Sequence, residues 1–324
     1  MIGVLIFSLI FLVSFFLLFW SGNVLVEALK RISKFLGWKE FVVSFFIVGL
    51  STTIPNFIVD LISAAERIPH LALGDVIGGN IVDLTLIVGI SALISRAGLS
   101  LSSRTVQGSS IFTILVAILP LVLIFDGELS RGDGILLLFT FFIYIFWLFQ
   151  KKERFEKIYD GIKEPLTLKF FFKNILLLFF SISILLLSGQ GIVKSALFFS
   201  NFFKIPLIFI GTLIVGFGNS LPEFSFCFQA ARKSQDWMII GDVMGSVILC
   251  ATLVLGSVAL ISPIKIFDSS QLVVSRIFLL ISAIIFLVFT RTGRKITKTE
   301  ALFLLFLYFC FLLTQILFLM NINE

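Results

Sequence analysis

The chain has 324 residues, of which 59% are hydrophobic and 14% charged, with a formal net charge of +6 and a mean hydropathy of +1.13. A soluble globular domain averages about 25% charged and about 45–50% apolar residues, so this composition excludes a soluble globule and indicates a polytopic membrane protein. The basic residues lie along the predicted membrane borders, and we therefore expect no nucleic-acid partner. All three cysteines fall inside apolar segments, which gives no disulfide framework.

Ten apolar segments are long enough to cross a bilayer as helices, since about 20 apolar residues span the hydrocarbon core. In chain order they are residues 2–20, 40–65, 70–95, 105–125, 132–150, 169–199, 205–231, 236–262, 270–290 and 300–320. The first segment lacks the basic start and small-residue cleavage site of a signal peptide, so we expect it to stay as a span. The predicted fold class is an all-α polytopic membrane protein with ten transmembrane helices.

Lys and Arg in the predicted connections are divided unequally between the two sides of the membrane. One alternating set of connections holds 19 of them, and the other set holds Arg67, Arg131, Lys194, Lys204 and Lys265, with Arg276 left inside a span. Positively charged connections stay in the cytoplasm. We therefore expect a cell-membrane protein (inner or plasma membrane) with both termini extracytoplasmic and the central connection, residues 151–165, cytoplasmic.

The chain aligns on itself without gaps at a constant shift of 167 residues. The matched segments include 21–22 with 188–189, 55–57 with 222–224, 74–76 with 241–243 and 85–86 with 252–253. Each half holds five predicted spans, an odd number, so the second copy must enter the membrane from the opposite side. We expect two inverted five-helix repeats, residues 1–150 and 166–324, tethered by residues 151–165, with a binding site near the membrane midplane.

The second and third predicted spans of each half carry glycine, proline and polar residues. They read GLSTTIPNFIVD (49–60) and GDVIGGNIVDLTLIVG (74–89), then GFGNSLPEFSFC (216–227) and GDVMGSVILCATLVLG (241–256). Proline after glycine and hydroxyl residues breaks a helix, and free carbonyls at membrane depth must face protein or a water-filled cavity. Such carbonyls and hydroxyls are hard oxygen ligands suited to Na⁺ or Ca²⁺. For helix breaks and close helix packing we single out Gly49, Pro55, Gly74, Gly78, Gly216, Pro222, Gly241 and Gly245.

GNSLPE followed by GDVMGS resembles the repeat signature of the Ca²⁺/cation antiporter superfamily, most closely its sodium/calcium exchanger branch. The resemblance covers the whole chain. It implies a secondary active antiporter, not an enzyme, that exchanges Na⁺ and Ca²⁺ by alternating access at a midplane carboxylate site. The ions are cargo, no cofactor is expected, and the partners are the lipid bilayer and small cations. The implied ion-site positions are Thr52, Thr53, Asn56, Gly79, Asp83, Asn219, Ser220, Glu223, Ser246 and Cys250.

The chain departs from this family pattern at three positions. Asn56 stands where the family has glutamate, Cys250 stands where it has Asn or Asp, and Gly79 lacks a hydroxyl. Only Asp83 and Glu223 among the central ligands can therefore be anionic. The reduced acid count also favours a cation/proton exchanger, in which a carboxylate takes a proton instead of Na⁺. A third interpretation is a degenerate relative that no longer transports.

Asp60 offers a replacement for the missing carboxylate. It follows Asn56 by four residues, one turn along the same helical face. Acids inside membrane spans are functional by default, so we hypothesise that Asp60 joins Asp83, Glu223 and Asn56 as a metal ligand. The alternative is a hydrated Asp60 at the outer mouth that binds nothing.

Two further aspartates, Asp75 and Asp242, follow a glycine near the predicted starts of their spans. Helix capping is the favoured interpretation, ahead of an ion vestibule. An intramembrane aspartyl protease also pairs two aspartates, but both sequences here lack the first glycine of GxGD, so this alternative is remote. His70 is expected at the surface. Cys250 is expected to be a small apolar filler rather than a soft-metal ligand.

Overall fold

The computed structural model describes all residues except 1, 37–52, 102–103, 150–166, 267–269 and 323–324. The described chain is almost entirely helical, which confirms the predicted all-α class. Eight of its helices are at least 18 residues long and apolar enough to cross a membrane by length and composition. The predicted span 40–65 is described only from Thr53 onward, so Gly49 and Thr52 lie outside the described residues.

The helices follow the order of the predicted spans, and four two-residue strands of the described chain, which were not predicted, lie between them. The first half contains α1 (Ile2–Phe35), α3 (Thr53–Ala65), α4 (Pro69–Ile81), η1 (Val82–Ile87), α5 (Val88–Ile94), β1 (Leu99–Ser100), α6 (Arg104–Leu123), η2 (Ile124–Asp126), β2 (Glu128–Leu129) and α7 (Arg131–Phe149). The second half contains α8 (Leu168–Phe203), α9 (Leu207–Ile210), η4 (Gly211–Val215), α10 (Gly216–Asn219), α11 (Leu221–Arg232), α12 (Asp236–Leu249), η5 (Cys250–Val254), α13 (Leu255–Ile261), β3 (Ile264–Lys265), α14 (Ser270–Arg291), β4 (Lys295–Ile296) and α15 (Lys298–Ile322).

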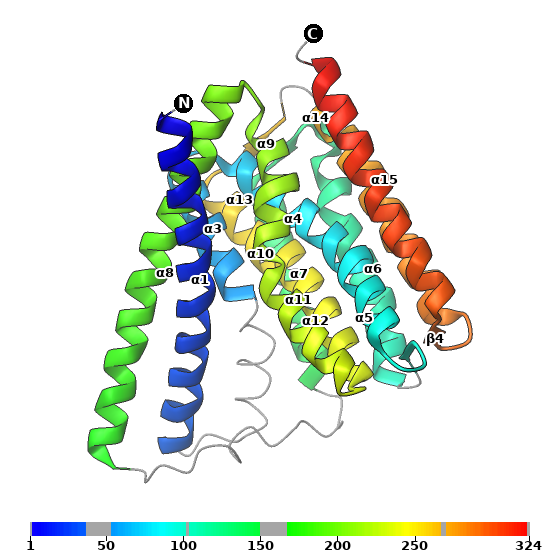
Figure 1. Cartoon of the computed structure of the whole chain (residues 1–324), viewed down its shortest axis with the longest axis horizontal. Coiled ribbons are helices and arrows are strands. Elements are labelled where there is room, and N and C mark those ends of the chain that lie inside the picture. The colour runs from blue at the N-terminus through cyan, green and yellow to red at the C-terminus, as the bar shows by residue number, and fades with distance from the viewer. Residues whose placement is uncertain (1, 37–52, 102–103, 150–166, 267–269, 323–324) are drawn as a thin grey trace.

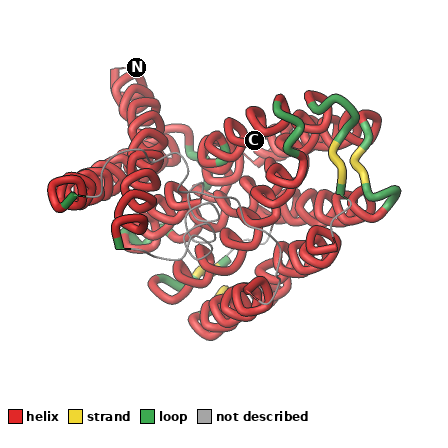
Figure 2. The backbone as a smooth tube through the Cα atoms, turned by 90° about the horizontal axis from the view of Figure 1, so that it is seen from below, coloured by secondary structure: helices red, strands yellow, loops and turns green. Residues whose placement is uncertain are grey.

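The first helix of each half is longer than a bilayer requires. α1 has 34 residues and α8 has 36, which corresponds to about 50 Å at 1.5 Å per residue, against about 30 Å of hydrocarbon. α1 therefore ends well beyond residue 20, where the apolar pattern predicted its end. The two helices pack along each other at one side of the bundle, as Figures 1 and 2 show. The rings of Phe7 and Phe198 stack between them.

Elements related by the 167-residue shift make reciprocal contacts between the halves. β1 pairs antiparallel with β4, and β2 pairs antiparallel with β3. The shift carries β2 onto β4, so the two small sheets mirror each other in sequence. Likewise α5 packs on α15, and α13 packs on α7. Each half thus completes the packing of the other instead of forming a separate domain.

α4 crosses η4 at very short range. A side-chain carbon on Gly74 would collide with the carbonyl oxygen of Ile208, and one on Gly78 would collide with that of Thr212. The four-residue glycine spacing thus permits the close packing that it predicted. Gly216, which follows η4, packs as closely, with Gly79 N 2.7 Å from where its Cβ would lie.

The equivalent glycines of the second half lack such a partner among the described residues. A Cβ added to Gly241 or Gly245 would have no described atom within 4 Å. By the 167-residue shift, the counterpart of η4 falls at residues 44–48, outside the described residues. Close packing at Gly241 and Gly245 therefore stays a prediction.

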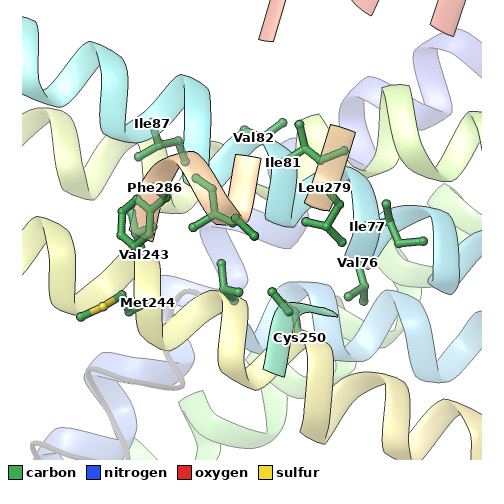
Figure 3. Packing of buried hydrophobic residues seen from close by; sticks show 14 of the residues in the cluster. Val76, Ile77, Ile81, Val82, Ile87, Val243, Met244, Cys250, Leu279 and Phe286 are labelled. Atoms are coloured by element: carbon green, nitrogen blue, oxygen red, sulfur yellow. The ribbon is translucent and has the colours of Figure 1, made fainter. Parts of the chain in front are cut away.

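Aliphatic side chains of α4, η1, α12 and α14 form the main core around this crossing (Figure 3). Ile77, Ile81, Val243 and Phe286 in this core are at most 2% exposed. Cys250 belongs to the same cluster, which fits its expected role as a small filler. This core holds the polar residues described next in fixed positions.

Candidate cation-binding site

The second span of the second half breaks where the sequence predicted. α10 ends at Asn219, α11 begins at Leu221, and Ser220 between them has φ −80° and ψ 0°. Pro222 lies in the first turn of α11, where its missing N–H costs nothing. Glu223 follows in that turn, so the free amides of the helix N-terminus favour its negative charge.

The third span of each half contains a π-helical turn at an expected site residue. η1 carries Asp83 and η5 carries Cys250, which are repeat-equivalent positions. Single π-turns inside α-helices are frequent at functional sites. No feature of the apolar pattern revealed them, because a π-turn changes the helical register by one residue without changing composition.

A narrow cavity, too tight for a water molecule in this structure, lies where the two halves meet. Its lining comes from α3, α4, η1, the α10–α11 junction, α12 and η5: Asn56, Asp60, Asp75, Val76, Gly79, Asp83, Ser220, Ser246 and Cys250. Most of the site residues expected from sequence therefore converge on one cavity. Thr53, Asn219 and Glu223 are buried but do not line the cavity themselves. Asn219 hydrogen-bonds the lining residue Asp75, Glu223 accepts from the lining residue Ser246, and Thr53 begins α3 three residues before Asn56.

Asp83 and Glu223 come from different halves and meet through a serine. The Ser246 hydroxyl donates to Glu223 Oε1 over 3.2 Å, and the Asp83 carboxylate interacts with the hydroxyls of Ser246 and Ser220. Asp83 is 2% exposed and Glu223 is 0% exposed. Two carboxylates so close together in a buried site repel each other unless a positive charge joins them.

Most buried oxygens without a hydrogen-bond donor among the described residues lie at this cavity or on residues beside it. They are Thr53 Oγ1, Asn56 Oδ1, both Asp60 oxygens, Asp75 Oδ1, Asp83 Oδ1, Asn219 Oδ1 and Glu223 Oε2. A buried polar atom left without a partner costs about 1–3 kcal/mol. Carboxylate, amide and hydroxyl oxygens are the ligands of hard cations such as Na⁺ and Ca²⁺. The arrangement can therefore bind cations.

Asp60 is buried, so it is not a hydrated residue at the outer mouth, and its role as an ion ligand stays a prediction. Its side chain is 0% exposed and lines the cavity from α3, one turn after Asn56. Asn56 in turn directs its amide nitrogen toward Cys250 Sγ, 4.0 Å away. The expected proximity of Asp60 and Asn56 is thus present.

The capping interpretation of Asp75 and Asp242 is wrong. α4 begins at Pro69 and α12 begins at Asp236, so both aspartates lie nearly two turns inside a helix. Asp75 is 1% exposed and accepts a 2.5 Å hydrogen bond from Asn219 Nδ2. Sequence reasoning ranked an ion-vestibule role for Asp75 below capping, because its partner Asn219 is 144 positions away in the chain.

His70 contacts a backbone group outside the cavity. Its Nε2 lies 2.7 Å from the Lys265 carbonyl oxygen of β3 in an exposed contact. This agrees with the expected surface position.

Comparison with known protein families gives one match in each half of the chain. The sequence profile of a family described as "Sodium/calcium exchanger protein" matches twice, over residues 6–150 and 173–317. The chain belongs to the sodium/calcium exchanger family. The two matches to the exchanger family are again offset by 167 residues, which agrees with the internal alignment.

Individual relatives have low sequence identity to this chain, but their alignments cover most of both chains. The sodium/calcium exchanger MaX1 of Methanosarcina acetivorans is 27% identical over 348 residues, covering 95% of this chain and 96% of that protein. Inner membrane protein YrbG of Escherichia coli is 26% identical over 263 residues, covering 78% and 79%. The putative antiporter CaxA of Alkalimonas amylolytica is 26% identical over 258 residues, covering 78% and 80%.

Solved structures of the sodium-calcium exchanger NCX_Mj share the fold. One, soaked with Na⁺ and Sr²⁺, superimposes with a TM-score of 0.63 at 24% identity, covering 95% of this chain and 97% of that one. Family and relatives together identify the protein as a multi-pass membrane cation antiporter.

Proposed function

We propose that this antiporter exchanges Na⁺ for Ca²⁺ at the cavity between its halves. The observation that carries the proposal is the buried meeting of Asp83 and Glu223 through Ser246. The same carboxylates cannot be neutralised by Na⁺ ions and by Ca²⁺ together, so binding of one ion expels the other. An empty, negatively charged cavity is costly inside a membrane, which couples the two fluxes.

The residues of the cavity take distinct roles in this proposal. Asp83 and Glu223 are the central anionic ligands, and Asp60 supplies a third carboxylate to the cavity. Neutral oxygens and the cavity wall come from Thr53, Asn56, Asn219, Ser220, Ser246 and Cys250, and Thr52, outside the described residues, stays a predicted ligand.

Alternating access is assigned to the long pair α1 and α8. Gly22 of α1 and Gly189 of α8 are repeat-equivalent, and both face α3, the helix that carries Asp60. A Cβ on Gly22 would lie 3.2 Å from Pro55 Cγ, and one on Gly189 would lie 2.6 Å from Ile62 Cδ1. These small residues give each long helix a smooth face against α3. Sliding of α1 and α8 then opens the cavity to one side at a time.

The proposed topology has ten helices in two inverted repeats, residues 1–150 and 166–324. The described start of α1 and end of α15 lie at the same end of the bundle (Figure 1). The opposite end carries the basic end of α1, with Lys30 and Lys34, and β4 with Lys295. By the positive-inside rule this basic end is cytoplasmic, and both termini are extracytoplasmic.

A cation/proton exchanger is the second candidate function. It is favoured by Asn56 and Cys250, which leave fewer anionic ligands than the family pattern has. In that case a carboxylate alternates between a proton and Ca²⁺.

Flux through reconstituted vesicles tests the proposed function. Uptake of ⁴⁵Ca²⁺ is expected when an outward Na⁺ gradient is imposed, and none is expected when a pH step is imposed without Na⁺. Uptake driven only by the pH step would show that H⁺, and not Na⁺, is the coupling ion. Absence of uptake under both gradients, with ion binding retained, would identify a relative that does not transport.

A further inference from the structure

Two carboxyl groups of the first half lie in direct contact beside the Asp83–Glu223 pair. Asp60 of α3 and Asp75 of α4 interact at hydrogen-bonding range, and they are 0% and 1% exposed. Neither Asp60 oxygen has a donor among the described residues, and neither has Asp75 Oδ1. Ionised carboxylates only accept hydrogen bonds, so this contact needs either a proton held on one of the two groups or a cation between them.

The repeat-equivalent contact in the second half has a hydrogen-bond donor that the Asp60–Asp75 contact lacks when both carboxyls are ionised. The 167-residue shift relates Asp60 to Cys227 and Asp75 to Asp242. There the Cys227 thiol points at Asp242 Oδ2, with 3.6 Å between the two atoms. A thiol can donate its hydrogen to a carboxylate, whereas Asp60 as a carboxylate cannot. At a pH where both carboxyls are ionised, the first-half pair therefore needs a cation between its oxygens, which the second-half pair does not.

Asn219 supplies a further ligand for such a cation. Its Nδ2 donates to Asp75 Oδ2, while its Oδ1 is buried and has no donor among the described residues. Asn219 comes from the α10–α11 break of the other half. Asp60, Asp75 and Asn219 therefore offer four unpartnered oxygens from both halves of the protein.

Hydrogen-bonding contacts link the buried acids of the cavity region in two pairs, and Asp75 also acts electrostatically on Asp83. Among the described residues, no three His, Cys, Asp or Glu side chains form one cluster that could hold a metal ion. One pair is Asp60 with Asp75, and the other is Asp83 with Glu223. A single Ca²⁺ neutralises only one such pair, which leaves two buried negative charges that a second cation would offset.

We propose that Asp60, Asp75 and the side-chain oxygen of Asn219 form a separate cation subsite, so that the cavity holds two hard cations at once. The subsite takes Na⁺ or Ca²⁺, the oxygen-seeking ions of the proposed exchange, and in that respect it rests on the proposed function. Asp75 becomes a direct ligand, and Asp60 serves this subsite instead of completing the Asp83–Glu223 pair.

Equilibrium binding to the purified full-length protein tests the subsite, with ⁴⁵Ca²⁺ and ²²Na⁺ measured separately. Asp75→Asn and Asp60→Cys are each expected to lose one bound cation equivalent for at least one of the two ions. The cation that still binds should reach half-saturation at a concentration within about fivefold of the wild-type value, because the other carboxylate pair is intact. Asp60→Cys recreates the Cys227–Asp242 pair and so keeps a donor for Asp75, which preserves folding. The matched control is Asp242→Asn, which removes the repeat-equivalent charge outside the cavity lining. Asp242 acts electrostatically on Asp83 and Glu223, so this variant should keep both equivalents even where their half-saturation shifts.

Two results would overturn the subsite. If wild type and both cavity variants bind the same number of Na⁺ and Ca²⁺ equivalents, the Asp60–Asp75 contact holds no cation. If both variants lose all binding, the cavity is one site and not two. Failure of the proposed exchange looks different, because wild type would then bind ions but show no Na⁺-driven ⁴⁵Ca²⁺ uptake.

Discussion

Glu223→Gln is expected to lower both Ca²⁺ affinity and Na⁺-driven Ca²⁺ uptake by at least about 100-fold, which corresponds to about 3 kcal/mol. Glu223 is fully buried, so its carboxylate has no water to compete for the cation. Removing one partner of a buried ion pair, here the carboxylate that pairs with the bound cation, costs about 3–5 kcal/mol. Binding of ⁴⁵Ca²⁺ to purified protein and uptake into vesicles measure the two effects.

The same substitution should leave the protein folded. The Ser246 hydroxyl that donates to Glu223 Oε1 can donate equally to the side-chain carbonyl of glutamine. Glu128→Gln is the matched control, because Glu128 forms a surface ion pair with Lys265, 3.7 Å between Oε2 and Nζ, and does not line the cavity. If Glu223→Gln binds Ca²⁺ about as tightly as Glu128→Gln does, Glu223 is not a ligand of the ion.

Gly78→Ala is expected to destabilise the protein by about 1–3 kcal/mol or more, because the added methyl group overpacks the helix crossing. The new carbon would collide with the backbone of Thr212 in η4, which cannot move aside as a side chain could. α4 would have to shift, and Asp83 follows Gly78 by only five residues. We expect a lower melting temperature in detergent and a lower yield of monodisperse protein.

Gly79→Ala provides the control on the same helix. Its added carbon would lie 3.5 Å from Ser220 Oγ, an ordinary contact distance, so its melting temperature should stay near that of wild type. Equal melting temperatures for Gly78→Ala and Gly79→Ala would show that the crossing of α4 and η4 is not as close as described.

The sequence predicted the fold class and much of the cavity for a physical reason. Polar groups are costly inside a membrane, so those that persist at helix breaks mark the place where protein faces protein. The break at Ser220 and the burial of Asp83 and Glu223 follow directly from this cost. The glycine pair Gly74 and Gly78 was informative because only a residue without a side chain permits such an approach.

Other features depend on information that hydropathy does not contain. α1 continues to Phe35 because a helix can extend past the lipid with basic residues such as Lys30, which an apolar pattern does not register. The role of Asp75 depends on where α4 begins and on Asn219 from the other half. Both are consequences of tertiary packing, and local sequence favoured a cap instead.

The location of a bound divalent ion tests most directly whether Asp83 and Glu223 enclose one cation pocket. Crystals soaked in Sr²⁺, a heavier stand-in for Ca²⁺, would show the ion by its anomalous scattering. We expect a peak that lies about 2.3–2.7 Å from a carboxylate oxygen of Asp83 and equally close to one of Glu223. A Sr²⁺ ion held by neither residue, or by only one of them with the other turned away, would contradict the proposed pocket.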